Sequence, residues 1–163
     1  DGQIFLESSL FFSGMRPAVN VGLSVSRVGG DAQTKAMKKA AGSLRIDLAQ
    51  YREMEVFTQF SSDLDDATKE QLEYGSGLME LLKQPLGKPM SLADKVITLC
   101  AARHKVMLGI PTAKVKGFQM DMLSYFASAH PEIAREIEET KDLSKELSQK
   151  IVEIAEEFKK SRC

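Results

Sequence analysis

After residue 31, apolar residues recur at every third or fourth position, which is the spacing of an amphipathic helix. The first such stripe predicts one long helix and consists of Met37, Ala41, Leu44, Leu48 and Tyr51. Further stripes predict helices within residues 67–82, 92–100, 115–126, 133–137 and 147–158. Because the connections between these segments are short, we expect a bundle of five or six mostly antiparallel helices.

Residues that favour particular positions in helices refine this picture. Ser91 and Asp94 resemble a capping box and predict the start of the third helix. Pro131 suits the first position of a short fifth helix. Gly42 lies inside the first predicted helix, where we expect it to permit close packing, and the segment 75–77 contains two glycines that predict a kink.

The first 30 residues instead show a period of two. Residues 4–6 and 19–25 predict two short strands, with glycine and proline at the turns between them. Two short strands do not form a stable sheet alone, so we expect them to belong to a larger β structure. The sequence therefore predicts a mainly α fold, in which a C-terminal helical bundle of five to six helices follows a short β-containing remnant.

Composition narrows the class of protein. The 163 residues are 43% hydrophobic and carry a net charge of −1, which is ordinary for a globular domain and argues against nucleic acid as a partner. The longest apolar runs, such as residues 10–12, are far shorter than the ~20 residues of a membrane span. Cys100 and Cys163 do not form a disulfide framework. The chain begins at Asp1 rather than at methionine, so we expect it to be part of a longer protein.

The sequence lacks the motifs of a self-contained nucleotide hydrolase. Gly87 and Lys88 are followed by Pro89, which does not fit a phosphate loop, and there is no GxGxxG pattern or GxSxG elbow. Cys100 and His104 lie four positions apart on a predicted helix, but a structural zinc site needs four ligands. We therefore predict no metal site, and interpret this pair as a buried cysteine and a partly exposed histidine.

Two groups of charged residues leave alternatives open. The acidic run Asp63, Asp65 and Asp66 is either a solvated helix cap or a loop that contacts a partner. Arg16 and Arg27 either pair with a carboxylate or use the planar guanidinium to bind phosphoryl oxygens. Because the chain has no phosphate loop, that phosphate would belong to another polypeptide or to a missing part of this protein.

Several long segments resemble one family. They are DGQIFLES at residues 1–8, RPAVNVGLSVSRVGG at 16–30, AQTKAMKKAAGSLRIDLAQYRE at 32–53 and FTQFSSDLD at 57–65. Together they closely resemble the alpha subunit of F-type ATP synthases, densely from residue 1 to about residue 85 and weakly afterwards. The resemblance implies that residues 1–31 are the end of a nucleotide-binding α/β domain and that residues 32–163 are a C-terminal helical domain.

The resemblance also implies roles for particular residues. Arg27 matches an arginine finger that reaches the catalytic site of the neighbouring beta subunit. Arg16, Pro17 and Gln84 match residues on the adenine side of a non-catalytic nucleotide site, whereas Leu86 stands where the family commonly has a second glutamine. The turn containing Asp63 and Asp65 resembles a loop that lies toward the rotating gamma subunit.

At the level of the whole protein, the resemblance implies a regulatory, non-catalytic subunit of a rotary complex that translocates protons or sodium ions. We expect no cofactor and no ATPase activity in the chain alone, but Mg-ATP in the full subunit. The implied partners are the beta and gamma subunits, without direct membrane insertion. The implied location is peripheral, on the cytoplasmic face of a bacterial membrane or the equivalent organellar face. The alternative is a free-standing helical interaction module whose N-terminal strands dock onto a partner's sheet.

Overall fold

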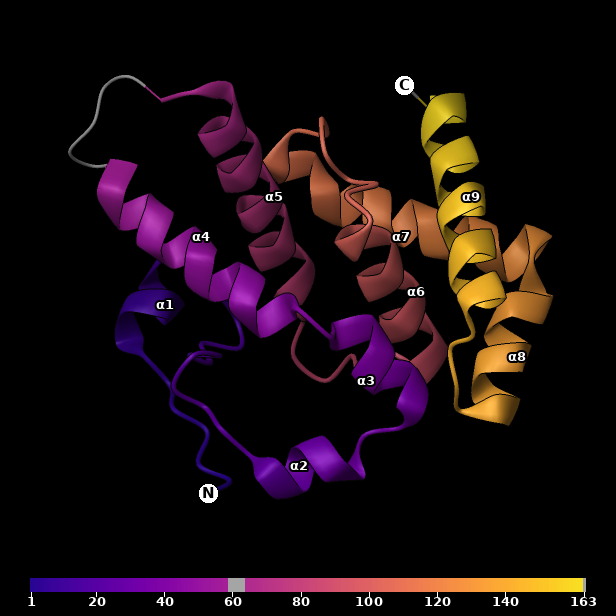
Figure 1. The fold of residues 1–163 in the computed structure, drawn as a ribbon, viewed down its shortest axis with the longest axis horizontal. Helices are drawn as coiled ribbons and strands as arrows, with labels where there is room; N and C mark the ends of the chain where they lie inside the picture. Colours follow the sequence, from indigo (N-terminus) through magenta and orange to yellow (C-terminus); the bar gives the residue numbers. More distant parts are fainter. Residues whose placement is uncertain (59–63, 163) are drawn as a thin grey trace.

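The computed structural model describes residues 1–58 and 64–162, and these residues are mainly helical (Figure 1). Residues 64–162 and the later part of the first segment form the bundle, while the N-terminal segment lies along one edge. The helices are α1 (Ser8–Phe12), α2 (Arg27–Ala32), α3 (Lys35–Ala41), α4 (Leu44–Thr58), α5 (Asp66–Leu82), α6 (Leu92–Arg103), α7 (Thr112–Ala129), α8 (Pro131–Thr140) and α9 (Lys145–Arg162).

Helix α6 lies at the centre of the bundle, between α5 and α9 in the view of Figure 1. It packs against α3, α7, α8 and α9. Its buried residues occupy most of the circumference of the helix and include Val96, Ile97, Cys100 and Ala101. The side-chain amide of Gln119 on α7 donates a hydrogen bond of 3.1 Å to the buried Thr98 hydroxyl on α6.

The predicted helix starts at Ser91 and Pro131 are confirmed. The Ser91 hydroxyl accepts a hydrogen bond of 3.0 Å from the Asp94 backbone amide, which satisfies one of the free amides at the start of α6. Pro131 is the first residue of α8, where its missing N–H is not needed. Thr34 and Asp65 cap α3 and α5 in the same way as Ser91 caps α6.

The single long helix predicted through residues 37–51 is wrong, because the chain breaks into α3 and α4 at Gly42 and Ser43. In a continuous helix the Lys39 carbonyl would accept a bond from the Ser43 amide. Here the Arg103 guanidinium donates to that carbonyl instead. A Cβ on Gly42 would lie 3.2 Å from the same guanidinium, so this glycine allows the close packing expected there. The described residues after α2 therefore form seven helices, not five or six.

The two strands predicted near the N-terminus are also not formed, and among the described residues only an isolated antiparallel bridge joins Leu6 to Val19. The two segments still run beside each other, because the Glu7 amide donates to the Ala18 carbonyl at 3.0 Å. The Asn20 amide also donates to the Phe5 carbonyl at 2.8 Å. The Asn20 side chain donates to the Glu7 carboxylate and accepts from the Leu23 amide within its own segment, which turns the chain there. Without further strands beside it, this pairing does not extend into a sheet.

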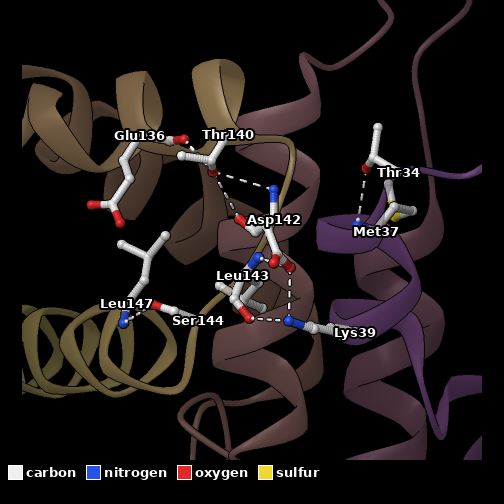
Figure 2. A network of polar contacts seen from close by, with 9 residues as sticks. All are labelled: Thr34, Met37, Lys39, Glu136, Thr140, Asp142, Leu143, Ser144 and Leu147. Atoms are coloured by element: carbon white, nitrogen blue, oxygen red, sulfur yellow. Dashed lines mark hydrogen bonds and ion pairs between the residues drawn. The ribbon is translucent and has the colours of Figure 1, made fainter.

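Helix α3 is fastened to the connection between α8 and α9 (Figure 2). The Lys39 ammonium donates to the Asp142 carboxylate at 2.7 Å and to the Leu143 carbonyl at 3.1 Å. The Thr140 hydroxyl accepts a bond from the Asp142 amide, and the Ser144 hydroxyl accepts one from the Leu147 amide at the start of α9. The two Lys39 bonds join a helix near the start of the bundle to its last helical pair, and the two hydroxyl bonds order the connection itself.

Helices α4 and α5 approach each other closely at Gly75. A Cβ on this glycine would lie 2.3 Å from the Tyr51 ring of α4, so only glycine fits without movement of the ring or the helices. Gly77, two positions further on, has no heavy atom within 4 Å of such a Cβ. Helix α5 continues through both residues, and Gly75 serves its packing against Tyr51. The kink predicted from the sequence stays a prediction.

Replacing Gly75 with alanine should lower the free energy of unfolding by about 1–3 kcal/mol, because the new methyl group overpacks the contact with Tyr51. The control is Gly77→Ala in the same helix, which should be neutral or stabilise by up to about 1 kcal/mol because alanine favours helix more than glycine does. Urea denaturation followed by circular dichroism measures both values. Equal destabilisation by the two substitutions would contradict the close contact.

The Lys39–Asp142 pair should make stability depend on acid pH. The hydrogen bond from Lys39 lowers the pKa of Asp142 below its ordinary value of 3.8. The folded state therefore favours the carboxylate, and this stabilisation is present above about pH 4 and is lost as the pH falls through the folded pKa. In Asp142→Asn, the free energy of unfolding should fall less steeply below pH 4 than in the unmodified chain. Asp31→Asn, at a more exposed and longer ion pair, is the control and should keep the original slope.

Candidate functional site

A hollow of about 660 Å³ lies between the N-terminal segment and the loop that follows α5. We call it the N-terminal hollow. The Gln84 backbone amide donates a hydrogen bond of 2.9 Å to the Arg16 carbonyl, and this bond holds the two segments together. The hollow is lined by Phe11, Arg16, Pro17, Ala18, Gln84, Pro85, Leu86 and Gly87. The structure therefore brings together three residues singled out from the sequence, namely Arg16, Pro17 and Gln84.

The walls of the N-terminal hollow are largely apolar, with one cationic and one amide side chain. The Arg16 guanidinium lies 4.2 Å from the centroid of the Phe11 ring, which is a cation–π contact. Leu86 is fully exposed at the rim. Residues of these types can hold a flat heterocyclic ring by stacking, with an edge hydrogen bond from an amide. The hollow is thus suited to a base-like group.

Phe11 is a lining residue that the sequence analysis did not identify. It falls in the short apolar run of residues 10–12, whose length excludes a membrane span but does not by itself indicate a binding residue. In the structure this run forms α1, and Phe11 packs edge-on against Phe12. The sequence signal that could have identified Phe11 is the pair of adjacent aromatic residues, Phe11 and Phe12, in a segment too short to bury both.

Arg27 lies apart from the residues that line the N-terminal hollow. It is the first residue of α2 and not the end of a strand, because the Ser26 hydroxyl caps this helix by accepting a bond of 2.8 Å from the Gly29 amide. The Arg27 amide donates to the Asp1 carboxylate at 2.8 Å. Its side chain is exposed, and within residues 1–58 and 64–162 no carboxylate forms an ion pair with it.

Of the two acidic residues predicted to face a partner, Asp63 lies outside the described residues. Asp65 is the N-cap of α5, and its carboxylate accepts a bond of 2.7 Å from the Thr68 amide. This bond lowers the pKa of Asp65 below its ordinary value. The helix-cap interpretation therefore holds for Asp65, whereas its contact with a partner stays a prediction.

The Cys100–His104 pair has local partners. The Cys100 thiol lies 3.2 Å from the Ser148 hydroxyl, and burial raises the pKa of the thiol. The His104 Nδ1 atom lies 2.8 Å from the Cys100 carbonyl oxygen. Within the part of the chain that the structure describes, no group of three or more candidate metal ligands comes together. Among the helices of that part, none has both the length and the apolar character needed to cross a membrane.

The described residues thus form a mainly helical domain with a largely apolar hollow at its N-terminal edge. The chain belongs to the family described as ATP synthase alpha/beta chain, C terminal domain, whose sequence profile matches residues 33–158. The division of the chain at residues 31 and 32 stays a prediction.

Similar curated proteins are ATP synthase alpha subunits. The chain is 54% identical over 160 residues to that of Clostridium kluyveri, which covers 98% of this chain and 32% of the relative. It is 51% identical over 158 residues to that of Petrotoga mobilis, and this match covers 97% of this chain and 31% of the relative. It is 50% identical over 160 residues to the alpha subunit of Mycolicibacterium smegmatis, and this match covers 98% of this chain and 29% of the relative. The chain therefore spans about a third of the length of these relatives, and the resemblance to the alpha subunit is confirmed.

Proposed function

We propose that this chain acts as the C-terminal portion of an alpha subunit in a rotary ATP synthase that translocates protons or sodium ions. In this role it is regulatory and non-catalytic. It completes the catalytic site of a neighbouring beta subunit through Arg27, closes one side of a non-catalytic nucleotide site and helps to surround the rotor. The chain alone has no ATPase activity, since it contains no phosphate loop.

The observation that carries this proposal is the N-terminal hollow. It joins Arg16 and Pro17 to Gln84, which is 67 residues away from Pro17 in the sequence, around a space of about 660 Å³. These residues match the adenine side of the nucleotide site in the alpha subunit. The phosphates and magnesium of a bound Mg-ATP would then be held by parts of the full subunit that precede this chain.

The position of Arg27 supports a role outside this chain. Its guanidinium is exposed, and it lies at the start of α2, where the backbone is fixed by the Ser26 cap and by the bond to Asp1. A permanently charged planar group supplied by one subunit can stabilise the charge on a phosphoryl group held by another. Movement between the subunits would withdraw it and so couple catalysis to subunit arrangement.

The exposed apolar residues of the N-terminal segment support its packing against further protein. Ile4, Leu6, Phe12 and Val28 are 69%, 70%, 84% and 71% exposed, respectively. A cluster of large exposed apolar side chains is typical of a surface that is covered in the complete protein. We propose that the preceding nucleotide-binding domain of the same subunit covers this surface.

The remaining parts of the proposal concern partners and location. The turn that contains Asp63 and Asp65 would face the gamma subunit. The Asp65 carboxylate accepts the bond from the Thr68 amide and so fixes the position of Asp65 at the start of α5. The subunit would be peripheral, on the cytoplasmic face of a bacterial membrane or the equivalent organellar face.

In the full complex, Arg27→Ala should reduce multisite ATP turnover by about 10³–10⁵-fold, the range measured for arginine fingers. Arg27→Lys should recover only a small part of the rate, because lysine keeps the charge but lacks the planar fork. Steady-state turnover of the purified complex measures the effect. Size-exclusion chromatography verifies that each complex has assembled.

The matched control is Arg135→Ala on α8, which removes an exposed arginine of the bundle and should leave turnover unchanged. An assembled Arg27→Ala complex with normal turnover would exclude Arg27 as the finger.

The N-terminal hollow can be tested by nucleotide affinity in the full-length subunit. Arg16→Ala removes the cation that faces Phe11 and should weaken binding of a fluorescent ATP analogue about threefold to tenfold. Leu86→Gln adds an amide at the rim and should tighten binding. An affinity unchanged by both substitutions would show that the nucleotide does not enter this hollow.

A further inference from the structure

A second hollow, of about 490 Å³, lies on the other side of α3 from the N-terminal segment, among α3, the end of α6 and the start of α9. We call it the basic hollow. Its size falls within the range of about 300–1,000 Å³ that is usual for small-molecule sites. Lys39, Arg103, His104 and Lys145 supply its basic groups. None of its lining residues takes part in the function proposed above, so this hollow does not depend on that proposal.

The charges around the basic hollow are unbalanced. No aspartate or glutamate is among its lining residues, whereas Lys39, Arg103 and Lys145 are cations. Asp142 offsets one of these charges through its bond to Lys39 (Figure 2). Within the described residues, neither Arg103 nor Lys145 forms an ion pair. About two positive charges therefore remain uncompensated at one concave surface.

The orientation of Arg103 is fixed while much of its hydrogen-bonding capacity remains. One guanidinium nitrogen donates to the Lys39 carbonyl, and the group rests against Gly42. A guanidinium has five N–H donors, and a fixed planar group can bind two oxygens of a phosphate at once. Lys145 is the first residue of α9, so the partial positive charge of the helix start adds to its own.

Part of the lining of the basic hollow is apolar. Val152 on α9 is half-buried and supplies apolar surface to the hollow, whereas Ala40, Leu143 and Cys100 are buried. A bare inorganic ion would leave this surface in contact with water. A ligand that has both an anionic head and an apolar body would contact the cations and the apolar surface together.

We propose that the basic hollow is a binding site for a small organic phosphate. Its phosphate group is held by Arg103 and Lys145, with Lys39 nearby, and its apolar part lies on Val152. Binding neutralises the convergent cations and covers the apolar surface in one step.

The test uses phenyl phosphate as the probe and follows the backbone amide signals of the 163-residue chain by nuclear magnetic resonance. Phenyl phosphate should shift the signals of Ala40, Arg103, Lys145 and Val152 in a saturable way. Inorganic phosphate, which has only the anionic head, should bind at least threefold more weakly. Benzyl alcohol, which has only the ring, should produce no saturable shift at these residues.

Lys145→Gln should raise the dissociation constant for phenyl phosphate about threefold to tenfold. The control is Lys160→Gln, which removes the same charge near the other end of α9 and should leave the constant unchanged. Arg103→Lys, verified as folded by its unfolding transition, should also weaken binding. Lysine keeps the charge but lacks the planar guanidinium that binds two phosphate oxygens at once.

Three results would overturn the proposal. One is the absence of saturable shifts around the basic hollow with phenyl phosphate. Another is equal weakening by Lys145→Gln and Lys160→Gln, which would indicate general attraction of anions to α9. The third is equal affinity for phenyl phosphate and inorganic phosphate, which would exclude an organic ligand.

Discussion

The structure depends on the burial of most of the surface of α6. Successive residues of a helix are about 100° apart, so the consecutive buried residues 96–98 and 100–102 face in nearly every direction. A helix of this kind must be surrounded, and α3, α7, α8 and α9 surround it. Thr98 is the polar residue on this buried surface. Its bond to Gln119 satisfies the hydroxyl and fixes the position of α7 along α6.

The same burial explains which parts of the fold could be predicted from the sequence. Helices with a regular apolar stripe and a capping residue, such as those that begin at Ser91 and Pro131, were predicted correctly. The break between α3 and α4 was missed because Arg103 donates to the Lys39 carbonyl, which would otherwise accept the helical bond from the Ser43 amide. Arg103 comes 60 residues after Ser43 in the sequence. Local periodicity contains no information about such a competitor.

The N-terminal segment shows another limit of pattern analysis. Residues 4–6 and 19–25 have the alternation of strands, and they do lie antiparallel, but a strand also requires neighbours on its edges. Pro17 and Gln84 were identified only through a family resemblance, whereas Arg16 was also a candidate because of its guanidinium group. By contrast, packing between distant segments places Phe11 at the N-terminal hollow and forms the basic hollow. Only the structure reveals these two features.

The bond between Lys39 and Asp142 joins residues that are 103 positions apart. At a synthesis rate of roughly 5–20 residues per second, about 5–20 seconds separate the appearance of these two residues at the ribosome. During that interval α3 has neither the Asp142 carboxylate nor the Leu143 carbonyl to bind. Helix α3 therefore gains these two bonds only after Asp142 and Leu143 have been made. Premature termination before Asp142 would therefore leave Lys39 without these two acceptors as well as removing α9.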